Sequence, residues 1–359
     1  MTTRENGLTV LSEYSTCTTH VGFSLLHDLN QILTDVGIET IPVKEAYPRQ
    51  SKDRLKQFRH PFILNLNDLE ATKGNALLVI CSTPRFLRVL ELIPHIKQRF
   101  DAIAVYFVDG FNALTMDDFG AKILRYVDYV FTPIEEMVPE ILNHGVKAVR
   151  YLPFGIDALN YVPINQERVI DVLFYGRGSE DHQRHLEKLY GGVDSKRFYV
   201  HSTFKCSELF SQQEHRRLHW NMLLRSKINI CFEASAVRRF HGRSPVLYRW
   251  YESMAAGTVV LGSRPKCRSA MDILNWPNST IDMPDSESDI RDLIESILTD
   301  NQMQMQIRND SRKAALTDHD WRYRLKEILE VLGIAFPQRL SEQLSRLEFM
   351  IDEKASSVG

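Results

Sequence analysis

Short, continuously apolar runs alternate with helical patterns along this chain, and this alternation constrains the fold more than any other feature. The runs ALLVIC and AIAVYFV lack the polar residues that a half-solvated antiparallel strand would carry. Such strands occur where helices cover both faces of a sheet. Because parallel neighbours need crossover helices, the order strand, helix, strand predicts an α/β fold with parallel sheets.

The alternation occurs twice, on either side of a polar linker at 160–168. Before the linker, the strand-like stretch Leu8–Ser15 leads through a loop to a helix that ends before Gly37. After it, IDVLFYG restarts the pattern, and a helix closed by Gly257 leads directly into the strand TVVLGS. The sequence therefore predicts two Rossmann-like domains, at 1–160 and 161–332, and a helical tail at 333–359.

Composition excludes several classes of protein. The 359 residues exceed one compact core, and 43% hydrophobic with 25% charged residues is typical of a folded soluble chain. We find no 18-residue apolar run, so no membrane span is expected. Because 44 Lys+Arg against 46 Asp+Glu give a formal charge of -2, no nucleic-acid partner is expected either.

The cellular compartment is predicted from the amino terminus and the cysteines. The opening residues lack an apolar signal segment, which favours a cytoplasmic protein. The five cysteines are an odd number, widely spaced and without a C-x-x-C pair, which fits a reducing compartment better than disulfides or a zinc site.

One candidate ligand site is the turn in VLFYGRGSEDHQR. In open α/β sheets ligands bind beyond the carboxyl ends of the strands, where helix amino termini expose N–H groups. Gly176 and Gly178 allow a tight turn or close approach of a ligand, and Arg177 and Arg184 stand beside them. On spacing alone, an ordinary turn with solvated arginines is the favoured interpretation.

A second candidate site lies in RSPVLYRWYESMAAGTVVLGS. Glu252 and Arg249 are three residues apart on a predicted helix, so they share a face and could form an exposed ion pair. The carboxylate could instead accept both hydroxyls of a ribose. Arg249 or Arg243 could then donate to a diphosphate as forked donors.

Three segments carry a resemblance to a known family. YRWYESMAAGTVVLGS resembles the E-A-x-A-x-G signature of nucleotide-sugar-dependent glycosyltransferases of the GT-B fold, family 4 type. RYLPFGID is similar to their interdomain turn, and IDVLFYGRGSEDHQRHLEKL to the opening of their donor-binding domain; the CgeB-like branch is the most similar. Ser244 or a neighbour stands where the earlier Glu of E-x7-E is expected, a departure that concerns contacts with the donor sugar. The likeness covers about 149–260.

This resemblance implies an architecture and a reaction. Two Rossmann-like domains would face each other across a cleft, with a C-terminal helix returning to the first. The activity would be transfer of a sugar, a hexose by analogy, from a nucleoside-diphosphate sugar to an unidentified acceptor, with retention and without a metal or further cofactor.

The resemblance also implies roles for the residues named above. Glu252 would bind the ribose, and Arg249 would assist or brace it. The turn Gly176-Arg177-Gly178 and Arg184 would face the phosphates. Arg243, with other cations of its loop, would neutralise the leaving diphosphate.

The amino-terminal half supplies two candidate catalytic residues. His20 lies in the loop after the first strand, which faces the cleft in this fold, although a lone histidine is more often structural. Asp109 directly follows a strand in VYFVDGFN, and an Asp before Gly is also a common turn residue. No pair of histidines has metal-ligand spacing, so no metal site is expected.

Two other classes of function remain open on the sequence. A catalytically inactive GT-B scaffold or binding protein is compatible with the missing earlier Glu. A nicotinamide-dependent oxidoreductase ranks last, because no first strand is followed by a complete G-x-G-x-x-G motif. The acceptor, the nucleotide base and the oligomeric state are left undetermined.

Overall fold

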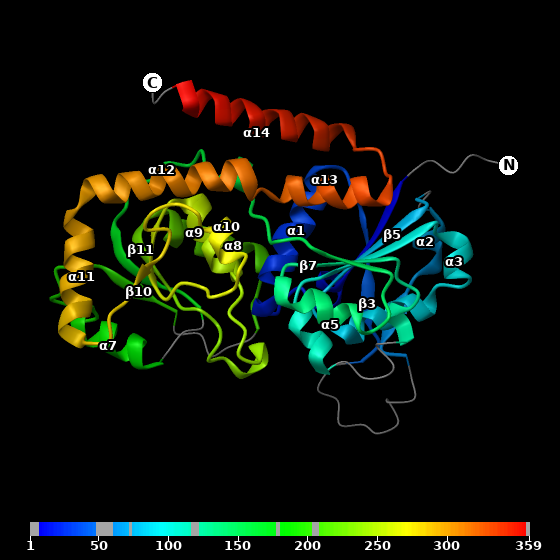
Figure 1. The fold of residues 1–359 in the computed structure, drawn as a ribbon, viewed down its shortest axis with the longest axis horizontal. Coiled ribbons are helices and arrows are strands. Elements are labelled where there is room, and N and C mark those ends of the chain that lie inside the picture. The colour runs from blue at the N-terminus through cyan, green and yellow to red at the C-terminus, as the bar shows by residue number, and fades with distance from the viewer. Residues whose placement is uncertain are drawn as a thin grey trace. The chain divides into compact units, whose positions relative to one another are not determined.

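A computed structural model describes residues 7–47, 60–71, 74–115, 122–176, 180–202 and 208–356. The chain forms two compact units, each with its own parallel sheet (Figure 1). Unit 1 comprises Met1–Pro153 and Arg322–Leu344, and unit 2 comprises Phe154–Trp321 and Ser345–Gly359.

Unit 1 contains a six-stranded parallel sheet in the order β2-β1-β5-β6-β7-β8. Its strands are β1 (Leu8–Ser12), β2 (Thr40–Ile41), β5 (Ala76–Cys81), β6 (Ala102–Phe107), β7 (Tyr129–Thr132) and β8 (Ala148–Tyr151). All six residues of β5 are buried, as its unbroken apolar sequence predicts. The antiparallel pair β3 (Val43–Glu45) and β4 (Phe62–Leu64) lies outside this sheet.

The first strand is shorter than the predicted Leu8–Ser15. It ends at Ser12, whose side chain accepts a hydrogen bond from the Tyr14 N–H and so begins the 3-10 turn η1 (Glu13–Thr16). A second turn, η2 (Val21–Phe23), leads into α1 (Ser24–Asp35), which is followed by Gly37 in the left-handed region at φ +82°.

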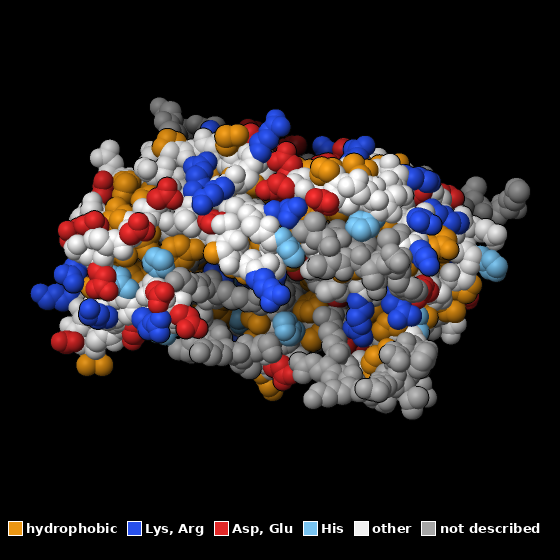
Figure 2. All heavy atoms as spheres, turned by 60° about the horizontal axis from the view of Figure 1, so that its bottom comes forward, with side chains coloured by type: hydrophobic (Ala, Val, Ile, Leu, Met, Phe, Trp, Pro, Cys, Tyr) orange, Lys and Arg blue, Asp and Glu red, His pale blue; other side chains and the backbone are white. Residues whose placement is uncertain are grey.

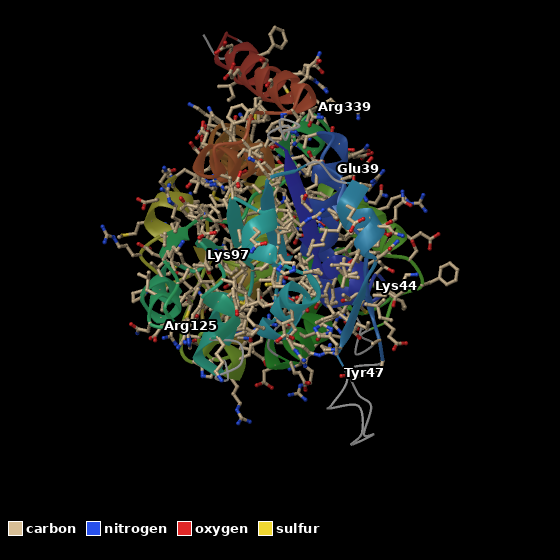
Figure 3. All side chains as sticks on the ribbon, turned by 90° about the vertical axis from the view of Figure 1, so that its right-hand side faces the viewer. Glu39, Lys44, Tyr47, Lys97, Arg125 and Arg339 are labelled. Atoms are coloured by element: carbon tan, nitrogen blue, oxygen red, sulfur yellow. The ribbon has the colours of Figure 1, made fainter. Side chains whose placement is uncertain are left out.

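The other helices and turns in the described residues of unit 1 are short. They are α2 (Leu66–Ala71), η4 (Pro84–Leu92), α3 (Ile96–Arg99), η5 (Gly110–Thr115), η6 (Glu135–Met137) and α5 (Val138–Leu142). The chain returns to unit 1 after unit 2, through α13 (Trp321–Leu332) and the start of α14 (Gln338–Ser356). There Gln343 donates to the Asp35 carbonyl at 3.3 Å, and Arg339 lies towards the same end of the unit as Glu39 (Figure 3).

Unit 2 contains a five-stranded parallel sheet in the order β10-β9-β11-β12-β13. Its strands are β9 (Ile170–Phe174), β10 (Tyr199–His201), β11 (Ser226–Cys231), β12 (Val259–Gly262) and β13 (Ile281–Asp282). One face packs its apolar residues, such as Val172 and Ile230, against α7 (Glu180–Tyr190) and α11 (Glu287–Thr299). On the alternate residues of β11, Asn229 donates to Ser253 at 2.9 Å, so α9 (Tyr248–Ala256) covers the other face.

The remaining helices of unit 2 are α6 (Ala158–Tyr161), α8 (Gln212–Leu224), the 3-10 turn η7 (Arg238–Phe240), α10 (Ala270–Ile273) and α12 (Asn301–Asp318). Two parallel α/β sheets confirm the predicted fold class. None of the helices that the structure describes is long and apolar enough to cross a membrane. Cationic and anionic side chains are interspersed on the face drawn in Figure 2, as a near-zero formal charge leads one to expect.

Candidate functional site

The candidate site of unit 2 is built on a helix that is buried almost all round. Along α9, Trp250, Tyr251 and Met254 are each at most 2% exposed, and the Trp250 indole donates to Thr280 at 2.9 Å. The helix ends at Gly257, whose φ of +66° forms its C-cap. Burial on every side fixes the orientation of α9 and therefore of the polar side chains it carries.

Glu252 projects from α9 into an interior cluster of basic side chains and is 5% exposed. Its Oε1 lies 2.6 Å from Arg216 Nη2 and 3.2 Å from His219 Nε2, both on α8. The His219 contact is within ion-pair distance but lacks hydrogen-bond geometry. Burial alone would raise the pKa of Glu252, but the charges of His219 and Arg216 outweigh it and lower the pKa to about 2. The exposed Arg249–Glu252 pair considered from the sequence is therefore not what anchors this carboxylate.

Tyr175, at the carboxyl end of β9, extends the same cluster. Its hydroxyl lies 3.1 Å from His215 Nδ1, and its ring centroid lies 4.7 Å from that of His219. Burial raises the pKa of Tyr175 to about 12, with Arg216 opposing and Glu252 adding to the rise. The phenol is therefore a neutral hydrogen-bonding group at physiological pH.

Arg249 reaches the glycine turn after β9. A Cβ placed on Gly176 would lie 2.6 Å from Arg249 Nη2, and the φ of Gly176 is +88°. A side chain at this position would thus collide with the guanidinium and strain the backbone. The structure brings Gly176, Arg249 and Glu252 to the region where β9 ends, three of the residues predicted as a donor site.

The other predicted donor residues are placed differently. Arg184 on α7 is exposed and pairs with Asp181 at 2.5 Å, three residues earlier on the same helix. Arg243 is half-buried in the loop before α9, where its N–H donates to the Phe240 carbonyl at 3.0 Å. Arg177 and Gly178 lie outside the described residues.

Glu233 is a residue at this edge that the sequence analysis missed. It follows β11, and its carboxylate accepts from the Ser235 N–H at 2.6 Å and the Ser235 hydroxyl at 2.5 Å. Burial raises its pKa, but hydrogen bonds from Ser235 and Ser244 outweigh burial and lower it. The signal in the sequence was an acidic residue directly after the apolar run INICF. Ser244, where a Glu was expected, therefore contacts a carboxylate supplied by another segment.

In unit 1, His20 and Asp109 both follow strands of the sheet. His20 Nδ1 accepts from the Gly22 N–H at 3.0 Å and caps η2, so it has a structural task in the fold. Asp109 follows β6, and its carbonyl accepts from the Asn112 N–H at 2.9 Å. The carboxylate that the sequence analysis missed here is Glu13, fully buried and bonded to the backbone and side chains of Ser82 and Thr83 at 2.7–3.1 Å.

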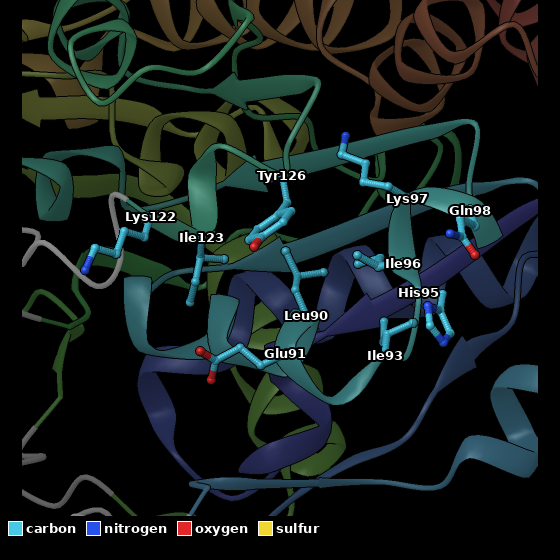
Figure 4. A pocket seen from close by; sticks show the side chains of 10 residues that line it. All are labelled: Leu90, Glu91, Ile93, His95, Ile96, Lys97, Gln98, Lys122, Ile123 and Tyr126. Carbon is cyan, nitrogen blue, oxygen red and sulfur yellow. The ribbon is translucent and has the colours of Figure 1, made fainter.

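A separate cavity of about 560 Å³ lies in unit 1, and both apolar side chains such as Leu90 and Ile123 and polar ones such as Glu91 and Lys122 line it (Figure 4). Its residues come just before β6 and just before β7, so it lies towards the amino-terminal edge of the sheet. None of the predicted site residues lines it. Within the part of the chain that the structure describes, no group of three or more His, Cys, Asp or Glu residues could hold a metal ion.

The sequence of the second half matches a known family. Residues 177–330 match the model of a family described as glycosyl transferase-like. This match begins at the glycine turn and includes α9 with Arg249 and Glu252. No curated protein has a sequence that matches the chain.

Solved structures share the fold over about nine-tenths of the chain. HepE from Anabaena, in complex with UDP and glucose, is similar at a TM-score of 0.56 and 12% identity, over 91% of this chain and 99% of that one. The chain has the GT-B fold. An alpha-glucosyltransferase in complex with UDP and a 13-mer DNA is similar at a TM-score of 0.57 and 13% identity, over 91% of this chain and 99% of that one. A glycosyltransferase from Rickettsia africae ESF-5 is similar at a TM-score of 0.53 and 10% identity, over 92% of this chain and 98% of that one. The family match covers residues 177–330 of this GT-B chain.

Proposed function

We propose that this GT-B protein is a glycosyltransferase whose unit 2 holds a nucleoside-diphosphate sugar. The observation that carries the proposal is Glu252, a buried carboxylate that Arg216 and His219 contact beside Tyr175 at the carboxyl end of β9. The family match over this segment and the UDP complexes of the similar structures support it.

The geometry suggests how the nucleotide would be held. Arg216 and His219 both contact Oε1 of Glu252, which fixes the carboxyl group and leaves Oε2 to accept the hydroxyls of a ribose. Arg249, against Gly176, would donate to the diphosphate from the glycine turn. The free backbone N–H groups at the start of α7 would face the same phosphates.

We further propose the chemistry of the transfer. The bond between the anomeric carbon and the diphosphate oxygen breaks, and a bond to an acceptor hydroxyl oxygen forms. The acceptor proton passes to the departing phosphate, so the reaction needs no strong protein base. The arginines stabilise the leaving charge in place of a metal, and the resemblance to the family 4 type and its CgeB-like branch supports retention of configuration.

Asp109 and His20 in unit 1 are the proposed groups on the acceptor side, and Arg184 and Arg243 remain proposed contacts to the donor. The formal charge of -2 argues against a nucleic-acid acceptor. We also retain the expectation of a cytoplasmic location.

Nucleotide titration tests the donor site. We expect isothermal titration to show binding of UDP, GDP or dTDP to the wild type, and Glu252→Gln to weaken it by about 10- to 100-fold, since hydrogen bonds to a charged group contribute about 1.5–3 kcal/mol. The matched control is Glu214→Gln, an exposed glutamate of α8 in the same unit.

The outcomes distinguish the possible functions. Because Glu252→Gln removes the negative charge that faces the buried Arg216, circular dichroism must show that the variant is folded. Arg249→Gln provides a second test that leaves the Glu252 cluster in place. Wild-type affinity in both variants, or no binding of any of the three nucleotides, contradicts the proposal. Binding without transfer or donor hydrolysis identifies an inactive scaffold.

A further inference from the structure

Three arginines of unit 2 meet at the amino-terminal edge of its sheet, where α9 ends. Arg168, just before β9, donates to the carbonyl oxygens of Ser226 and Ala256. Arg312 of α12 donates to the same Ala256 oxygen at 3.2 Å and to the Ile164 oxygen at 2.8 Å. Two guanidinium groups therefore share one carbonyl oxygen at the carboxyl end of a helix.

Arg308 adds a third positive charge to this pair. It lies four residues before Arg312 on α12, and a Cβ on Gly257 would come within 2.6 Å of its Cγ and 2.9 Å of Arg312 Nε. The Nε atoms of Arg308 and Arg312 are buried without a hydrogen-bond partner. Among the residues that the structure describes, no carboxylate forms an ion pair with any of the three arginines.

The cluster is electrostatically unfavourable as it stands. Burial, with the charges of Arg308 and Arg312, lowers the pKa of Arg168 to about 9, and burial with the charge of Arg308 lowers the pKa of Arg312 to about 10. Cations at the end of α9 are stabilised by its terminal carbonyls, which accounts for Arg168 and Arg312. It does not account for Arg308, whose side chain makes no hydrogen bond to the described part of the chain.

We propose that Arg168, Arg308 and Arg312 form a second anion site, for a phosphate-bearing ligand. Guanidinium groups bind phosphate oxygens through paired N–H donors, and a dianion would balance charges that the protein leaves unbalanced. Arg168 and Arg308 are only half-buried, so a ligand can reach them. The site lies at the carboxyl end of α9, where Ala256 comes four residues, or about 6 Å along the helix axis, after Glu252.

Thermal unfolding with inorganic phosphate tests this site, with chloride at matched ionic strength as the reference. Phosphate effects at the proposed donor site are common to the wild type and the Arg308 variant, so the difference between the two reports the arginine cluster. We expect phosphate to raise the melting temperature of the wild type by about 2–4 °C, which corresponds to about 1 kcal/mol of binding energy. Arg308→Gln should abolish this rise, and Arg291→Gln, which removes an exposed cation of α11 in the same unit, should keep it.

The phosphate-free melting temperature separates a binding role from a structural one. Since the Arg308 side chain repels Arg168 and Arg312 and forms no hydrogen bond with the described residues, Arg308→Gln should unfold at the same temperature as the wild type or higher. A lower melting temperature, with no phosphate effect in the wild type, would show that the arginines serve only to pack α12 on α9. A rise with phosphate that is equal in Arg308→Gln also overturns the proposal. Neither result depends on whether a nucleotide sugar binds, because failure of the donor site leaves the Arg308 comparison intact.

Discussion

At the scale of single residues, the proposed donor site depends on keeping the Glu252 carboxylate ionised in the interior of unit 2. An isolated carboxylate as buried as Glu252 would become protonated, because transferring a charge from water to a low-dielectric medium is costly. Arg216 and His219 reverse this by placing positive charge at one oxygen. The carboxylate that would meet the ribose is thus fixed by residues about 35 positions earlier in the chain.

Gly176 gives a prediction at this scale. Gly176→Ala places a Cβ 2.6 Å from Arg249 Nη2 at a φ of +88°, so we expect displacement of Arg249 and at least a tenfold loss of nucleotide affinity. Gly145→Ala is the control, since Gly145 has a φ of +83° and nothing within 4 Å of the added Cβ. Both variants should lose about 1 kcal/mol of stability from backbone strain, as urea unfolding would measure. Equal affinities in the two variants would show that the Arg249 contact is unimportant for binding.

At the scale of elements, α8 is the part of the site that the sequence analysis did not identify. Its segment QQEHRRLHWNMLL has no strong apolar stripe, and its buried face is largely polar. His215, Arg216 and His219 recur at helical spacing on that face. Such a pattern is typical of a solvated helix. In the structure this face is instead packed against a carboxylate on α9.

The turn η2 gives a prediction at the scale of elements. His20→Ala removes the acceptor for the Gly22 N–H, and we expect a loss of about 1 kcal/mol, the usual effect of removing a helix cap. His20→Asn restores an acceptor and should recover most of that stability in denaturant unfolding. Failure of Asn to recover it would mean that the ring itself is needed. A fall in kcat common to both variants would assign His20 a role in catalysis as well.

At the scale of the whole molecule, the buried cluster should control acid stability. The folded pKa of Glu252 is about 2 against an ordinary value of 4.5, so the unfolded state binds a proton first as pH falls. The contribution of ionised Glu252 to the free energy of unfolding is therefore fully present above pH 4.5 and is lost as pH falls toward 2. The total loss is roughly 3 kcal/mol. Urea unfolding across this interval should show a smaller pH dependence for Glu252→Gln than for the wild type. An unchanged dependence would show that other carboxylates dominate.

The sequence by itself determined the class of fold and the position of the glycine turn and α9. Local signals sufficed, because continuous apolar runs, helix stops at glycine and Arg249–Glu252 on one helix are all set by neighbours in the chain. It also predicted Gly176, Arg249 and Glu252 as one group, and the structure brings these three to one region of unit 2.

Tertiary structure alone decided which partners those residues have. Three groups of side chains come together only when the sheet orders its strands differently from the chain. They are Arg216 and His219 beside Glu252, Ser244 beside Glu233, and Arg168 beside Arg312. Side-chain burial follows from the same packing, and Glu252 forms an interior ion pair with Arg216 of α8 in place of the exposed Arg249–Glu252 pair considered from the sequence. Periodicity reports which face of a helix is apolar, but a polar face is buried only because another element supplies the opposite charge.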